Sequence, residues 1–248
     1  MFGDVMTFDY FFILLIIALL SIVQSFFGMG ILIFGTPTLL LVGYSFPETL
    51  SYLLPASWAI AFLQVLTAGP LRVSISRSLY FLCLPAIGVG IFFSTSPQII
   101  SVVNIIIGAT LIISAMINFS KNTKNIISSL LKKNLVVYHF VMGIVHGLTN
   151  LGGALLVILA KEVQSDKNKI RYTVAYYYLA FNSVQILFLA FIMGHLNILI
   201  SHSFTAAVSL STYFFIGNKV FDSVSNKFFN SALSLFIGIY GVIILLKL

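Results

Sequence analysis

The sequence predicts an all-α polytopic membrane protein. About eight hydrophobic segments form two inverted repeats, and a glycine-rich cluster breaks the first segment of each repeat into a hairpin. Three observations support this. Hydrophobic residues are 60% of the 248 residues and charged residues are 8%, against about 25% charged in soluble domains. Two long uncharged runs contain glycine-rich clusters about half a chain apart, and lysine and arginine occur only outside the hydrophobic segments.

The first segment, 10–43, is too long for one straight crossing. The uncharged run from Tyr10 to Pro47 contains 38 residues, which as a helix would extend roughly 57 Å, whereas a bilayer core is about 30 Å thick. Three glycines and a proline interrupt it between Gly28 and Pro37, so we expect the helix to break there. Where a helix opens at membrane depth, its free backbone N–H and C=O groups must form hydrogen bonds with other parts of the protein or with water in a cavity. The break is therefore a candidate binding site.

Charged and helix-breaking residues delimit the other segments. The sequence Ser-Thr-Ser-Pro at 94–97 resembles a helix start, with an N-cap followed by proline, and 194–197 has the equivalent place in the second half. The fifth segment is broken by the glycine, threonine and asparagine cluster at 146–154. The segments are 49–68, 78–93, 98–119, 135–160, 172–193, 198–217 and 228–246.

The two halves share one order of features within a single transporter domain, 1–248. Repeat 1 covers about 8–120 and repeat 2 about 134–248. In each, a glycine cluster is followed by a short polar or charged loop, a span that ends at Gly69 or Gly194, and two further spans. Duplicated halves with paired broken helices are how many secondary transporters form a site at the membrane midplane.

The basic residues distinguish two topologies. If each broken segment crosses the membrane once, the two sides receive seven and six of the 13 lysines and arginines; if each turns back, one side receives twelve and the other only Lys247. The positive-inside rule favours the hairpins, with both termini outside the cytoplasmic membrane and the basic loops in the cytoplasm. Whether the hairpins cross fully or partly stays open, since 10–27 alone is long enough to span.

Composition excludes several other assignments. Asp4 and Asp9 stand where a signal peptide carries basic residues, so we expect no cleavable signal. The single cysteine, Cys83, permits neither an intramolecular disulfide nor a thiolate metal cluster, and we expect it to be buried. Membrane-flanking loops that contact anionic lipid explain the net charge of +7, so no nucleic-acid partner is expected.

Two motifs resemble those of a known family. The cluster 28–30 that leads to Pro37, and Gly152-Gly153 ahead of 169–173, resemble the TauE/SafE family of sulfite and sulfonate exporters, and the resemblance covers about 12–246. The family pattern is a longer glycine run closed by a proline in both halves; here the first run has fewer glycines and Leu159 stands where the second proline is expected. The resemblance implies transport of a small sulfur-containing anion across the cytoplasmic membrane.

The substrate site is expected where the two breaks meet. A helix that restarts at a break presents free N–H groups and a positive dipole end, which favour an anion, and hydroxyl and amide side chains add neutral donors. The candidate residues are Gln24, Ser25, Gly28, Gly30, Thr36, Ser57, Gln64, His146, Thr149, Asn150, Gly152, Gly153, Asn182 and Gln185. We expect no catalytic residue, metal ligand or cofactor.

Helix packing is the alternative role for many of these residue types. Small residues in membrane helices allow close packing, and serine or threonine hydroxyls bond their own helix carbonyls. His146 either carries a coupling proton or complements the anion, or it is neutral and bonded to a backbone carbonyl. We expect packing for Gly88, Gly90, Gly108, Gly238, Gly241 and Trp58, and either role for Gln64 and Gln185.

Function classes other than a carrier have less support. An intramembrane enzyme needs a nucleophile with a base, or a metal cluster, and the four histidines form no HExxH motif. No Asp, Glu, Lys or Arg lies inside a predicted span, so coupling to protons stays open and a channel or facilitator is the alternative. Membrane lipid and a small anion are the expected partners; self-association stays open.

Overall fold

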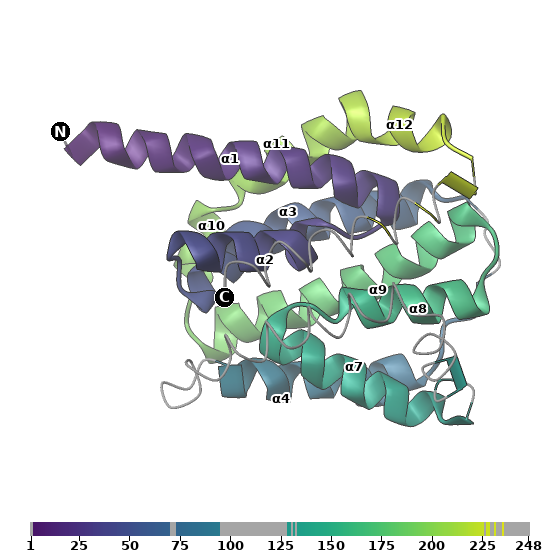
Figure 1. Ribbon diagram of the computed structural model, residues 1–248. Coiled ribbons are helices and arrows are strands. Elements are labelled where there is room, and N and C mark those ends of the chain that lie inside the picture. The colour runs from purple at the N-terminus through teal and green to yellow at the C-terminus, as the bar shows by residue number, and fades with distance from the viewer. Residues whose placement is uncertain are drawn as a thin grey trace.

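The chain forms a bundle of helices in the computed structural model (Figure 1). The structure describes residues 2–69, 73–94 and 133–225, together with 128, 129, 131, 227, 228, 231 and 235; for 2–9 it describes the backbone alone. The described residues contain no strand. The predicted segment 98–119, and 228–246 apart from three positions, lie outside the described residues, as do Gly108, Gly238 and Gly241.

The described helices confirm the all-α fold. Four of them are long and apolar enough to cross a membrane, and three shorter ones are also apolar. The helices of the first half are α1 (Phe2–Phe27), α2 (Ile31–Val42), α3 (Phe46–Thr67), a π-helical turn η1 (Leu79–Cys83) and α4 (Leu84–Ser94). Those of the second half are α7 (Leu135–Thr149), α8 (Gly153–Val163), α9 (Lys167–Leu187), η2 (Phe188–Ile192), α10 (Leu196–Ser201), α11 (Phe204–Thr212), η3 (Tyr213–Gly217) and α12 (Asn218–Asp222).

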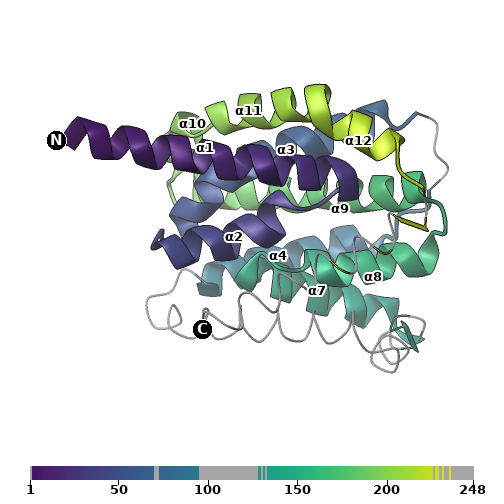
Figure 2. The ribbon, with the colours of Figure 1, turned by 45° about the horizontal axis from the view of Figure 1, so that its top comes forward.

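Both broken segments are hairpins. After α1 the chain turns and α2 returns toward the end of the bundle where α1 began, whereas α7 and α8 enter from and return to the opposite end (Figures 1 and 2). In the first hairpin α1 includes an apolar stretch of 18 residues, Tyr10–Phe27, that is long enough to span, while α2 has 12 residues. In the second, α7 and α8 have 15 and 11 residues. The first hairpin thus combines one full crossing with one partial arm, and both arms of the second are short.

Helix α9 begins five residues before the predicted span at 172. The side chain of Asp166 accepts hydrogen bonds from the backbone N–H groups of Asn168 and Lys169, at 2.9 and 3.2 Å, and this N-cap starts the helix at Lys167. Arg171, one residue before the predicted span, therefore lies within a helix long enough to span.

The segment predicted at 198–217 lies within an apolar helical stretch, Leu196–Asp222, that is long enough to span. It breaks at His202 and Ser203, between α10 and α11, and continues through η3 and α12 to Asp222.

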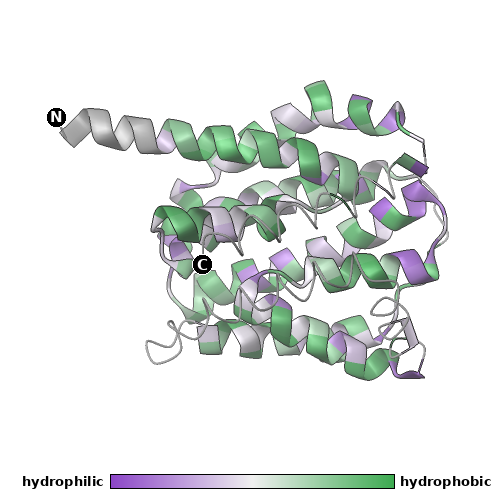
Figure 3. Cartoon of the chain, in the orientation of Figure 1, coloured by the Kyte–Doolittle hydropathy of each residue, from purple (hydrophilic) through white to green (hydrophobic). Residues whose placement is uncertain are grey.

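Many hydrophilic residues lie at one end of the bundle (Figure 3). The end of α8, the starts of α7 and α9, and α12 lie there, while the amino terminus, the α2–α3 connection and α10 lie at the opposite end (Figure 1). The described lysines and arginines are at or next to the elements of the first end: Arg77, Lys133, Lys161, Lys167, Lys169, Arg171, Lys219 and Lys227. We call this the basic end. This one-sided distribution is the one that the hairpin topology predicts.

Glycines bring α4 and α7 into close contact. A Cβ at Gly90 would lie 2.8 Å from the Cα of Gly147 and from the backbone nitrogen of Leu148, and a Cβ at Gly147 would overlap the carbonyl oxygen of Ile87. Gly90 therefore has the packing role expected from the sequence. Cys83 is buried and unpaired, also as expected.

Two glycines on α4 allow a matched test of this packing. Gly90→Ala forces α4 and α7 apart, and we expect it to destabilise the protein by about 1–3 kcal/mol. Gly88→Ala is the control, because its Cβ would meet only a carbon of Phe188 at 3.9 Å, and alanine favours a helix. Thermal unfolding in detergent measures both; equal melting temperatures for the two variants would contradict close packing at Gly90.

Accessibility of single cysteines tests the hairpin topology. In a Cys83→Ala background, exposed Arg77→Cys and Ser165→Cys should react with an impermeant reagent from the same side of the membrane, and exposed Ser45→Cys from the other. If each broken segment instead crossed once, Arg77→Cys and Ser165→Cys would label from opposite sides.

Candidate functional site

The two breaks touch each other inside the bundle. Asn150, in the second break, donates from Nδ2 to Oγ1 of Thr36 on α2 at 2.7 Å. A Cβ at Gly153, the first residue of α8, would lie 3.3 Å from Sδ of Met29 in the first break. Asn150 and Thr36 are fully buried. The hairpins from opposite ends therefore place their breaks together, as expected for a site shared by two halves.

Amide side chains satisfy the backbone at the first break. The Oε1 atom of Gln24 accepts from the N–H of Ile31 at 3.2 Å and so caps α2, while its Nε2 donates to the carbonyl oxygen of Ser57 at 2.8 Å. The Nε2 atom of Gln64 donates to the carbonyl oxygens of Gln24 and Ser25, each at 3.0 Å. The predicted free N–H groups at this break are thus partly occupied, because Gln24 binds the first of them.

Asparagine, rather than glycine, makes the turn at the second break. Asn150 has φ 63° and ends α7, a left-handed conformation that asparagine tolerates better than most residues. Its Oδ1 accepts from Nε2 of Gln185 on α9 at 3.1 Å. Gly152 and Gly153 have a steric role, because a Cβ at Gly152 would lie 2.6 Å from Cβ of His146 and one at Gly153 would overlap the Tyr178 hydroxyl.

A polar seam joins α3 to α9 beside the breaks. The Nδ2 atom of Asn182 donates to Oγ of Ser57 at 2.9 Å, and Nε1 of Trp58 donates to Oγ of Ser183 at 3.0 Å. Ser57 also bonds Gln24, so the seam is continuous with the cap of α2. Trp58 is partly buried and stacks on Phe62, in keeping with its expected packing role.

Several buried polar atoms around the breaks have no hydrogen-bond partner among the described residues. Both ring nitrogens of His146 are among them, and the ring lies against Phe181 at a centroid distance of 4.6 Å. The backbone bond considered as the alternative for His146 is thus not formed. The others near the breaks are Gln64 Oε1, the Tyr178 hydroxyl, Asn182 Oδ1 and Gln185 Oε1. An unpaired buried polar group is costly, so this concentration makes the region around the breaks the candidate site.

The structure brings the predicted site residues together, with one exception. The hydroxyl of Ser25 bonds a carbonyl of its own helix at 2.6 Å, and Ser25 reaches the network only through its backbone. The hydroxyl of Thr149 also bonds its own helix, at 2.7 Å, but it accepts from the N–H of Leu151 in the second break at 3.2 Å. Gly28 and Gly30 shape the first break: Gly28 has φ +79° and closely approaches Arg171, and a Cβ at Gly30 would lie 2.8 Å from the backbone nitrogen of Gln24.

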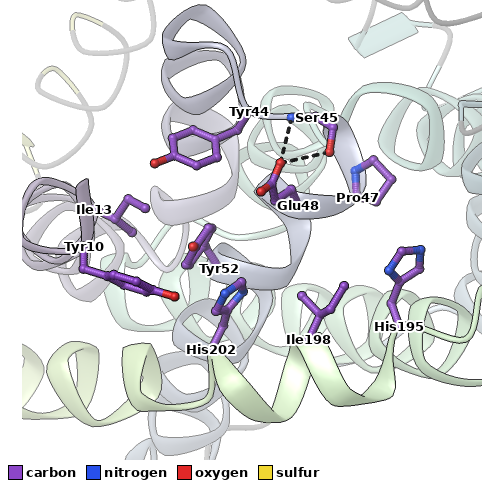
Figure 4. A pocket seen from close by; sticks show the side chains of 10 residues that line it. All are labelled: Tyr10, Ile13, Tyr44, Ser45, Pro47, Glu48, Tyr52, His195, Ile198 and His202. Atoms are coloured by element: carbon purple, nitrogen blue, oxygen red, sulfur yellow. Dashed lines mark hydrogen bonds between the residues drawn. The ribbon is translucent and has the colours of Figure 1, made fainter. Parts of the chain in front are cut away.

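One cavity lies at each end of the bundle. The cavity at the end opposite the basic one has a volume of about 510 Å³ (Figure 4). In it, Glu48 accepts from Ser45, and the buried His202 stacks on Tyr52 at 3.7 Å and bonds Ser51. Its lining residues are Tyr10, Ile13, Tyr44, Ser45, Pro47, Glu48, Tyr52, His195, Ile198 and His202. The cavity at the basic end has about 230 Å³ and includes Gln64 and Arg171.

Arg171 and Tyr178 are absent from the set of residues predicted from the sequence. Arg171 stood outside the predicted span, although Asp166, five residues before it, is a residue type that favours the N-cap of a helix. No sequence pattern marks Tyr178 as a site residue, since tyrosine is common in helix packing. Only the contact of its hydroxyl with Gly153 in the structure shows that it lies at the second break.

Comparison with known proteins gives one match, to a family model. A family model described as "Sulfite exporter TauE/SafE" matches residues 13–244. No curated protein and no solved structure matches the chain.

The Asn150–Thr36 bond should couple the two breaks energetically. In a double-mutant cycle, Thr36→Val removes the acceptor, and Asn150→Gly removes the amide while keeping the left-handed turn. We expect a coupling energy of about 1 kcal/mol in unfolding of the detergent-solubilised protein. Additive effects of the two substitutions would show that the bond does not link the hairpins.

Proposed function

The chain belongs to the sulfite exporter TauE/SafE family, and we propose that it is a secondary transporter of a small sulfur-containing anion such as sulfite or an organosulfonate. The family is one of membrane transporters, so a carrier rather than an enzyme is the function proposed. The basic end would face the cytoplasm, with the termini outside the cytoplasmic membrane.

The contact between the two breaks is the observation that carries the proposal. Beside it, His146 supplies an N–H donor in either neutral tautomer and Tyr178 an O–H donor. Both side chains are buried; the Tyr178 hydroxyl has no partner among the described residues, and His146 lies near the Gln185 side chain without a hydrogen bond of ordinary geometry. The Tyr178 hydroxyl lies against Gly153 at the start of α8, where the positive end of the helix dipole favours negative charge. Together these groups can hold an oxyanion without a fixed counter-charge, which suits a carrier that must also release it.

The two separate cavities support alternating access as the mechanism. Helix α3 connects them, with Tyr52 lining one and Gln64 the other, and the Gln24–Ser57–Asn182 network lies between these residues along the helix. We propose that rearrangement of this network, as one half moves against the other, opens the break site to each cavity in turn. A channel or facilitator is the alternative: a channel would conduct without saturating, whereas a facilitator would saturate but would not respond to a coupling gradient.

Uptake into proteoliposomes tests the function. Labelled sulfite, thiosulfate, sulfate and a short organosulfonate are offered with and without a pH gradient. We expect saturable uptake of at least one anion, and a response to the gradient would show proton coupling. Solute-independent conductance would favour a channel, and no uptake of any anion would contradict the proposed substrate class.

Two break variants locate the site in the same assay. Gly30→Leu and Gly152→Leu place side chains against Gln24 and His146, so we expect each to lower uptake to the level of empty liposomes while the protein stays monodisperse. Gly88→Ala is the control with wild-type uptake. Normal transport in both break variants would show that these glycines serve helix packing and not the substrate site.

A further inference from the structure

The cavity at the basic end has the character of an anion site. It is lined by Gln64, Thr67, Ala68, Asn168, Arg171 and Tyr172. The arginine is the only charged residue in this lining, and the others supply amide and hydroxyl groups. Arginine presents a planar fork of donors that matches oxyanions, and amides and hydroxyls can add further donors. The chemistry of the lining thus fits a small oxyanion better than a cation.

The Arg171 guanidinium is held in place with part of its bonding capacity unused. Its Nη1 donates to the carbonyl oxygen of Ser25 at 3.3 Å and to Oδ1 of Asn218 at 3.5 Å, and its Cζ lies 3.5 Å from the centre of the Phe221 ring. A guanidinium has five N–H donors, and both of these bonds use one nitrogen. Among the described residues no carboxylate forms an ion pair with it; the acidic group whose charge influences it is the exposed Asp222.

The same cavity is in direct contact with the first break. Gln64 lines the cavity and donates to the carbonyl oxygens of Gln24 and Ser25. The Ser25 carbonyl therefore accepts from both Gln64 and Arg171. An anion in the cavity would compete for the donors that hold the end of α1, so its binding is linked to the position of the break.

We propose that this cavity is a vestibular anion site in which Arg171 and Asn168 bind a small oxyanion, such as sulfite, between the basic end and the breaks. The place of the site in a transport path rests on the proposed function. Binding itself does not, because it requires only the cavity and its donors.

Equilibrium binding of radiolabelled sulfite to the purified protein in detergent tests the proposal. Arg171→Gln should raise the Kd for sulfite about tenfold or more, which is the effect of losing a charge-assisted hydrogen bond. Arg171→Lys should have a Kd between those of the wild type and Arg171→Gln, since lysine keeps the charge without the planar fork of donors. Asn168→Leu, at an exposed position, should raise the Kd several-fold without touching the Phe221 contact.

Lys167→Gln is the matched control. Lys167 also lies over the Phe221 ring, at 4.5 Å, and bonds the Phe221 carbonyl oxygen, but it does not line the cavity. We expect its Kd to be unchanged. An equal rise in Lys167→Gln and Arg171→Gln, or an unchanged Kd in Arg171→Gln and Asn168→Leu, would overturn the vestibular site.

A second background separates this site from the breaks. Binding that persists in Asn150→Gly, which removes the amide from the break site but keeps the left-handed turn, and disappears when Arg171→Gln is added is vestibular. Binding that disappears in Asn150→Gly alone would place all sulfite at the breaks and overturn the proposal. If sulfite binding depends on Arg171 but the wild-type protein takes up no anion, only the proposed transport is contradicted. If the protein takes up anions but sulfite binding does not depend on Arg171, only the vestibular site is contradicted.

Discussion

The rest of the structure depends on one constraint: a backbone opened inside an apolar bundle must find hydrogen-bond partners. At the first break the partners are amide side chains, with Gln24 capping α2 and Gln64 binding the last carbonyls of α1. At the second break Asn150 makes the turn and bonds across to Thr36. Because these side chains come from α1, α3 and α7, satisfying the breaks also fixes how the helices of the two halves meet. The side chains that stabilise the fold at the breaks are therefore also those that form the candidate site.

The overall architecture was predictable because it follows from length, composition and charge. An uncharged run longer than a membrane is thick must turn or break, and the distribution of lysine and arginine favoured hairpins over single crossings. Residues such as Gln24, Ser57, Asn150 and Asn182 could be selected because a polar amide or hydroxyl in an apolar span needs a nearby partner. Their partners are long-range in sequence, with Gln24 and Ser57 separated by 33 residues and Asn150 and Thr36 by 114, so no local pattern could identify which pairs form.

The unpredicted features come from local competition and from tertiary contacts. The glycines at 152 and 153 suggested the turn, but Asn150 makes it, and the glycines are needed because His146 and Tyr178 leave no space for a Cβ. Arg171 stood outside the predicted span because charge was used to end that span, whereas the Asp166 cap extends α9 past it. A cation can occupy this place because the Phe221 ring and the Ser25 carbonyl replace water around part of it.

The α3–α9 seam also gives the protein an intrinsic optical reporter. The chain has a single tryptophan, and its indole N–H bonds Ser183 across the boundary between the two halves. Indole emission depends on hydrogen bonding and on the polarity around the ring. Any motion that separates α3 from α9 must break this bond, so the fluorescence of Trp58 follows the relative position of the halves in the unlabelled protein.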